Sequence, residues 1–158
     1  MLALVARLPS AAQVMLVDSV GKKVRFLQDV VDALGLTNAT VRQARAEDIA
    51  EFKGGLRESF DAVVCRAVGN LATLIELSLP LVKVDGLLLA IKGEKAQEEI
   101  VAAERALQEL RGEVVATERT PTGTIVAIRK TAKTVRLYPR EQGLAARKPL
   151  GFKTDDGG

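Results

Sequence analysis

The stretch Val14-Met15-Leu16-Val17-Asp18-Ser19 decides the fold of this chain, because an apolar run ends there in a carboxylate and a helical pattern follows. Four consecutive apolar residues are typical of a buried β-strand. Ser19 is a favourable N-cap, and Gly35 is the expected end of the helix. A carboxylate at the end of such a strand often accepts hydrogen bonds from both ribose hydroxyls of a nucleotide-like cofactor. Asp18 is therefore a candidate ribose ligand, or alternatively a charge favoured by the helix dipole.

The rest of the chain continues to alternate strands and helices. Apolar runs predict strands at residues 39–41, 60–65 and 87–91, and helical spacing predicts helices at 70–79 and 94–111. Residues 1–8 are expected to be the end of a helix, and residues 45–49 a turn or a short helix. No helix separates the last two strands, at 114–115 and 124–128, so they are expected to pair antiparallel. The pattern predicts an α/β domain with a mostly parallel sheet that is covered on both faces.

Polar residues follow the predicted strands, at the edge where ligands bind in such sheets. They are Asp18, the turn at 44–48, Arg66 and Lys92. Arg66 comes directly after a buried strand, so its guanidinium needs an acidic or phosphate partner or an exit to solvent, a structural salt bridge being the alternative. Lys92 is expected to meet a phosphate or a substrate base, or alternatively to be a snorkelling surface lysine.

Composition excludes several classes of function. The chain has 158 residues, a formal net charge of +3, 47% hydrophobic residues and no histidine. Histidine-based acid–base catalysis is therefore excluded, and with Cys65 as the single cysteine neither a metal site nor an intrachain disulfide is expected. No apolar stretch approaches the roughly 20 residues of a membrane span. We expect a globular protein of a reducing compartment, with no membrane or metal partner.

Basic residues gather near the C-terminus. Between Arg129 and Lys153 there are eight lysines and arginines and one acid, Glu141. This pattern predicts two regions, an α/β domain at residues 1–130 and a basic tail at 131–158. Such a tail is suited to neutralising phosphates, and a solvated terminus is the alternative.

Five segments, taken in order, are similar to the GidB/RsmG methyltransferases. Residues 17–27, Val-Asp-Ser-Val-Gly-Lys-Lys-Val-Arg-Phe-Leu, resemble the segment after that family's second strand. The others are Arg45-Ala46-Glu47-Asp48, Cys65-Arg66-Ala67-Val68, the run from Ile91-Lys92-Gly93 to Ile100, and the pair Tyr138-Pro139-Arg140 and Lys148-Pro149-Leu150. The resemblance spans about residues 3–150, and its ordered combination is specific although each piece alone is weak.

This resemblance implies a function and a fold. The family transfers a methyl group from S-adenosylmethionine to N7 of a guanine in small-subunit, 16S-type ribosomal RNA. The implied fold is the Rossmann-like sheet of methyltransferases with antiparallel terminal strands. The implied partner is ribosomal RNA or the small ribosomal subunit, and we expect a monomer in the bacterial cytoplasm, or alternatively in a plastid or mitochondrion. The alternative function is a non-catalytic RNA-binding remnant of the family.

The resemblance also implies roles for particular residues. Cofactor binding falls to Asp18, Ala46, Glu47 and Arg66, and the catalytic residues are expected to be Arg66 and Lys92. RNA contacts are expected from Arg45, Lys92, Arg136, Arg140, Arg147 and Lys148. Guanine N7 carries a lone pair and no proton, so its methylation needs positioning and electrostatics rather than a general base.

One part of the family pattern has no counterpart here. The 17 residues before Asp18 contain no glycine, whereas the family has a first strand and a glycine-rich loop upstream. That strand is central, so its absence removes a neighbour from both halves of the sheet. We expect that the start of the gene was placed too late. The alternatives are a degenerate fragment and a chain that is completed by another polypeptide.

Overall fold

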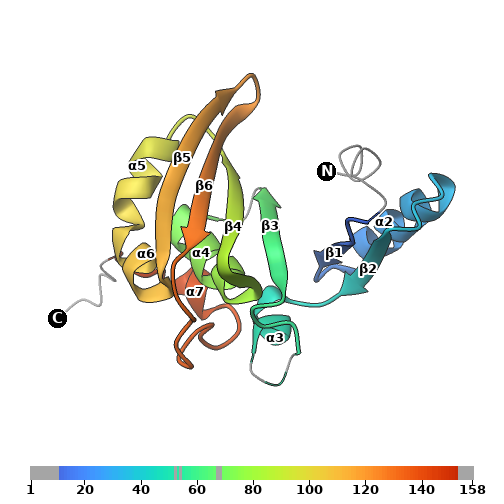
Figure 1. The fold of residues 1–158 in the computed structure, drawn as a ribbon, viewed down its shortest axis with the longest axis horizontal. Coiled ribbons are helices and arrows are strands. Elements are labelled where there is room, and N and C mark those ends of the chain that lie inside the picture. The colour runs from blue at the N-terminus through green and yellow to red at the C-terminus, as the bar shows by residue number, and fades with distance from the viewer. Residues whose placement is uncertain (1–10, 52, 54, 67–68, 153–158) are drawn as a thin grey trace. The chain divides into compact units, whose positions relative to one another are not determined.

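The computed structural model describes residues 11–51, 53, 55–66 and 69–152. They form two compact units, which divide between Ala46 and Glu47. The helix predicted for residues 1–8 lies outside the described residues. Each unit contains its own sheet (Figure 1).

The first unit is a strand–helix–strand motif. Strand β1 (Val14–Asp18) pairs in parallel with β2 (Ala39–Gln43), and α2 (Gly21–Ala33) connects the two strands. Leu16 of β1 and Val31 of α2 are its buried apolar residues. The strand, helix and second strand predicted from the sequence are confirmed, with boundaries shifted by one or two residues.

The second unit is built on a four-stranded mixed sheet in the order β3-β4-β6-β5. Strands β3 (Phe60–Arg66) and β4 (Val82–Lys92) are parallel, whereas β5 (Gly112–Thr120) and β6 (Gly123–Lys130) form the predicted antiparallel hairpin. Strand β6 also pairs antiparallel with β4 and so lies between β4 and β5. Among the described residues, β1 pairs only with β2 and β3 only with β4.

Strand β4 begins five residues earlier than predicted, because its start contains an irregularity. The register shifts between Phe60, which pairs with Val82, and Ala62, which pairs with Leu87. Gly86 makes this irregularity possible, since a Cβ there would lie 2.7 Å from the carbonyl oxygen of Asp61.

Short helices connect and cover these strands. They are α3 (Ala46–Ala50), α4 (Leu71–Ser78), the 3-10 turn η1 (Leu79–Leu81), α5 (Ala96–Ala102), α6 (Glu104–Leu110) and α7 (Leu144–Arg147). The single helix predicted for residues 94–111 is therefore two helices. They meet at Ala103, whose N–H is shared between the carbonyls of Glu99 and Ile100. The helix predicted for residues 70–79 is confirmed as α4, with Asn70 as its N-cap.

The core of the second unit lies between one face of the sheet and helices α4, α5 and α6 (Figure 1). Leu88 and Ala90 of β4 and Val126 and Ile128 of β6 are fully buried against these helices. Residues of the opposite face, such as Leu89, are half-buried.

The basic C-terminal segment packs into this core instead of extending from it. Tyr138 and Leu150 belong to the core cluster. Arg57 donates hydrogen bonds to the carbonyls of Tyr138 (2.7 Å) and Thr134 (2.8 Å), which fastens the segment to the loop before β3. Residues 131–152 thus belong to the same compact unit as the sheet, because a few apolar and carbonyl anchors offset the surrounding charge.

Candidate functional site

Asp18 ends β1, and its carboxylate has two contacts within its own unit. Its Oδ1 accepts a hydrogen bond from the Val20 N–H (2.9 Å), and its Oδ2 lies 3.5 Å from Lys23 Nζ. These contacts hold the carboxylate at the start of α2, as the helix-charge interpretation requires. A carboxylate offers about four lone-pair positions, so acceptor capacity remains for a diol such as ribose. The side chain is 28% exposed and therefore accessible.

The end of β2 lies beside Asp18. Gln43 is its register partner, and the Ala44 N–H donates to the Asp18 carbonyl (3.2 Å). The turn that carries exposed Arg45 and half-buried Ala46 therefore begins at the carboxyl edge of the first unit. Sequence reasoning missed Gln43, whose amide lies over Gly21, because the predicted strand ended two residues too early.

Glu47 is the first residue of the second unit and is buried, at 7% exposure. Its Oε1 accepts a hydrogen bond from the Gly143 N–H (3.1 Å). The neighbouring Asp48 accepts a hydrogen bond from the side-chain amide of Gln142. The carboxylates of α3 therefore face the C-terminal segment of this unit, a contact that the sequence did not predict.

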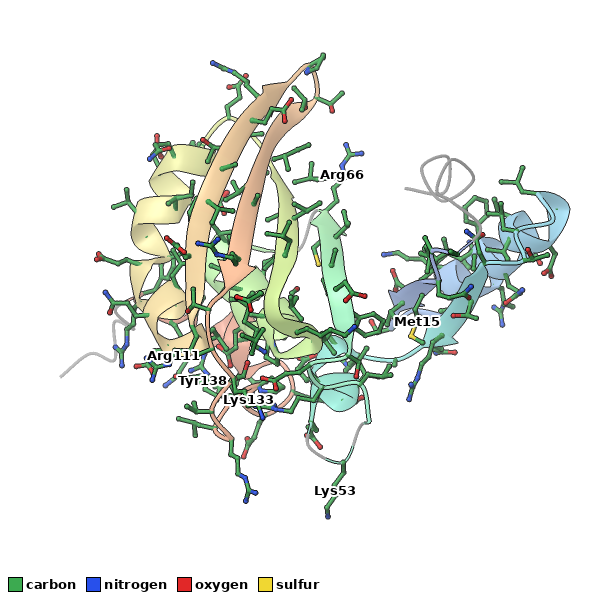
Figure 2. The ribbon with its side chains drawn as sticks, in the orientation of Figure 1. Met15, Lys53, Arg66, Arg111, Lys133 and Tyr138 are labelled. Atoms are coloured by element: carbon green, nitrogen blue, oxygen red, sulfur yellow. The ribbon has the colours of Figure 1, made fainter. Side chains whose placement is uncertain are left out.

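Arg66 ends β3 and is exposed. Figure 2 shows its side chain extending beyond the end of that strand. No hydrogen bond or ion pair joins its guanidinium to another described residue. Of the two sequence interpretations, the structure therefore favours an exit to solvent over a salt bridge within the described chain. Arg66 pairs in register with Ile91, so it lies at the same edge as the end of β4.

Lys92 ends β4 and is buried, at 9% exposure, so it is not the surface lysine of the alternative interpretation. Its Nζ donates to Glu99 Oε2 and to the Gly69 carbonyl, both at 2.8 Å. Glu99 Oε2 also accepts a hydrogen bond from the Leu71 N–H (2.8 Å). Sequence reasoning gave Glu99 no role, although the run from Ile91 to Ile100 that resembles the family has a glutamate at this position and a variable residue at Glu98.

The four arginines and lysines of the C-terminal segment that are expected to contact RNA differ in their surroundings. Arg136, Arg147 and Lys148 are exposed. Arg140 instead makes a bidentate ion pair with fully buried Glu76, with nitrogen–oxygen distances of 2.8 and 2.6 Å. The hydrogen bond to Glu76 raises the pKa of Arg140 above its usual value. Its guanidinium is thus committed within the fold.

Basic residues near β6 lie away from the carboxyl edge. Lys133 and Tyr138 are at the end of the second unit opposite Arg66 (Figure 2). The register agrees, because β6 starts beside Lys92 and ends at Lys130, beside the beginning of β4.

The remaining candidates are structural. Cys65 Sγ lies 3.2 Å from Ser78 Oγ, and burial raises the pKa of its thiol, which disfavours the reactive thiolate. The described residues contain no group of three or more acidic, cysteine or histidine side chains that could hold a metal ion. Among the described helices, none is both long and apolar enough to cross a bilayer.

The family model described as rRNA small subunit methyltransferase G (GidB) matches residues 2–126. The chain belongs to this family. It is 44% identical over 144 residues to ribosomal RNA small subunit methyltransferase G of Geobacillus thermodenitrificans, covering 87% of this chain and 60% of that relative. It is 45% identical over 127 residues to ribosomal RNA small subunit methyltransferase G of Sorangium cellulosum, covering 80% of this chain and 52% of that relative. The chain thus spans about three fifths of the length of such relatives.

Solved structures support the fold. A SAM-dependent methyltransferase from Methanosarcina mazei superimposes with a TM-score of 0.62 at 13% identity, covering 84% of this chain and 87% of that one. TYW2 of M. jannaschii, solved in complex with AdoMet, gives a TM-score of 0.56 at 13% identity, covering 74% of this chain and 56% of that one. The chain therefore has the methyltransferase type of α/β fold that the resemblance implied.

Proposed function

We propose that this chain is the methyltransferase part of a protein that methylates N7 of a guanine in small-subunit ribosomal RNA. The observation that carries the proposal is the family match over residues 2–126, which includes Asp18, Arg66 and Lys92. S-adenosylmethionine is the proposed methyl donor. The proposed partner is 16S-type rRNA or the small ribosomal subunit, and the proposed setting is the bacterial cytoplasm.

The donor groups at the carboxyl edges fit this cofactor. Asp18 retains acceptor capacity for two ribose hydroxyls after it has accepted the Val20 N–H. Ala46, the first residue of α3, follows the turn after β2 and is assigned to the adenine. Glu47 has one carboxylate oxygen engaged by Gly143 and the other left as an acceptor for the adenine amino group. Arg66 is suited to the cofactor's carboxylate, because a guanidinium binds carboxylates in a bidentate manner.

The reaction does not require the protein to remove a proton from the base. S-adenosylmethionine supplies an electrophilic methyl group. The N7 lone pair forms the new carbon–nitrogen bond while the carbon–sulfur bond breaks, so the positive charge passes from sulfur to the base. No proton leaves N7, which agrees with a sequence that contains no histidine. The chain's residues act by orienting the reactants and by binding RNA phosphates.

The test is a calorimetric titration of the chain with S-adenosylhomocysteine. Asp18→Asn keeps an oxygen to cap Val20 but loses the charge and one acceptor. We expect affinity to fall about 10- to 100-fold, since a hydrogen bond to a charged group contributes about 1.5–3 kcal/mol. Asp32→Asn is the matched control, because Asp32 lies in the last turn of the same helix and is exposed; its affinity should equal that of the wild type.

The same titration separates the enzyme from the RNA-binding remnant. Binding by the wild type that Asp18→Asn weakens supports a working cofactor site. A folded chain that binds RNA but no S-adenosylhomocysteine contradicts the proposal and supports the remnant.

A further inference from the structure

Three elements meet at the carboxylate of Glu99. The residue lies in α5, and its Oε2 accepts hydrogen bonds from Lys92 Nζ at the end of β4 and from the Leu71 N–H at the start of α4. Lys92 also donates to the Gly69 carbonyl. One carboxylate thus connects β4, α4 and α5 at the carboxyl edge of the sheet.

The contacts lie next to the register partner of Arg66. In the sheet, Arg66 pairs with Ile91, the residue before Lys92, and adjacent strands lie about 4.8 Å apart. Gly69, Asn70 and Leu71 are the described residues that lead into α4. Glu99 and Gly69 hold Lys92 and with it the end of β4, which carries the register partner of Arg66, so these contacts restrict the position of the end of β3.

We propose that Glu99 is a positioning residue, which holds Lys92 and the start of α4 so that Arg66 stands correctly for the cofactor. This inference rests on the proposed function. It changes the role expected for Lys92, two of whose three ammonium protons are committed to Glu99 and Gly69. Lys92 acts first by holding backbone, and Glu99 itself touches neither cofactor nor RNA.

Removing Glu99 has two physical consequences. The buried Lys92 ammonium loses its counter-charge, and the Leu71 N–H loses its acceptor, which Asn70 does not replace because its side chain accepts from Thr73. Glutamine at this position keeps an acceptor oxygen for both donors, whereas methionine keeps the bulk and removes the acceptor.

The test compares Glu99→Met, Glu99→Gln and Glu98→Met in the full chain by titration with S-adenosylhomocysteine. We expect Glu99→Met to weaken binding about tenfold or more and Glu99→Gln to restore it to within about threefold of the wild type. Glu98 is exposed in the same helical turn, so Glu98→Met is the matched control and should bind as the wild type does. Exchange of the Leu71 amide, followed by NMR, should accelerate only in Glu99→Met.

A second variant covers the case in which Glu99→Met does not fold. Lys92→Met/Glu99→Met leaves no unpaired buried charge, yet it still releases Gly69 and Leu71, so it should also bind at least about tenfold more weakly. Wild-type affinity in this variant or in Glu99→Met, or an equal loss in Glu98→Met, would overturn the inference. A wild-type chain that binds no S-adenosylhomocysteine refutes the proposed function itself, and the two failures are thereby distinguished.

Discussion

Two buried lysines end neighbouring strands of the second unit, and they are held in different ways. Lys130 ends β6 at 0% exposure, and its Nζ donates to Glu58 and to the carbonyls of Leu79 and Val82, at 2.8, 3.1 and 2.8 Å. Lys92 ends β4, and its Nζ reaches only Glu99 and Gly69 among the described residues. An ammonium has three protons, so Lys130 is saturated and Lys92 is not.

The difference is between a lysine whose three ammonium protons are all committed and one that keeps a donor for the proposed function. Lys130 lies at the beginning of β4, far from the edge where ligands bind in such sheets, and its contacts join β4, β6 and the loop before β3. Lys92 lies at the carboxyl edge beside the end of β3, and two of its three ammonium protons have acceptors among the described residues. Under the proposed function, the third proton is the one that can meet a ligand.

The largest expected effect extends this contrast to the arginines of the C-terminal segment. Arg140 forms a bidentate ion pair with Glu76 and also donates to the Lys148 carbonyl. Arg140→Met should destabilise the chain by about 3–5 kcal/mol, because it leaves the fully buried Glu76 without its counter-charge. Urea unfolding measures the change.

Arg147→Met is the matched control, since Arg147 is exposed in α7. Its stability should change by less than about 0.5 kcal/mol, while its RNA affinity should fall and its salt dependence flatten. The assignment fails if both variants are as stable as the wild type and lose RNA binding equally.

The second effect compares the two lysines directly. Lys130→Met removes the lysine donor from the buried Val82 carbonyl, whereas the Leu79 carbonyl keeps the Val82 N–H. It should lower the free energy of unfolding by about 1–3 kcal/mol, the cost of one unsatisfied buried group. Lys92→Met leaves one such carbonyl, on exposed Gly69, and should cost about 1 kcal/mol or less. Urea unfolding curves of the two variants measure which one loses more stability. A larger loss in Lys92→Met than in Lys130→Met would contradict the distinction between the two lysines.

Local patterns predicted the elements and their order, and they also predicted where the polar strand ends lie. Asp18, Arg66 and Lys92 end β1, β3 and β4 because strands end where apolar runs end. Apolar periodicity could not show the break at Ala103, because the stripe continues through both helices.

The partners of the buried charges were beyond prediction for a physical reason. Glu76 and Arg140 are 64 residues apart, and Glu58 and Lys130 are 72 apart. Ion pairs between distant residues leave no periodic trace, so Arg140 looked the same as Arg147 in the sequence. Only the folded chain shows that one guanidinium is enclosed and the other exposed.

The smallest effect is a pH dependence that belongs to the saturated pair alone. Burial raises the pKa of Glu58, but hydrogen bonds from Lys130 and the Thr134 N–H outweigh it, so its pKa lies below the ordinary value of 4.5. A carboxyl group with a lowered folded pKa stabilises the fold above its unfolded pKa, and this contribution is lost as the pH falls through the folded pKa. The difference in free energy of unfolding between the wild type and Glu58→Gln should therefore be largest above pH 4.5, and it should become smaller as the pH is lowered.

Urea unfolding at a series of values from about pH 7 to about pH 3 measures this difference. The Lys130→Met background supplies the control. There Glu58 has lost the lysine that contributes most to lowering its pKa, so replacing it with glutamine should produce a much smaller pH-dependent difference. A difference that stays constant over the whole range would show that the Lys130–Glu58 pair acts through packing and shape rather than charge. The contrast with Lys92 would then rest on burial and not on the number of committed donors.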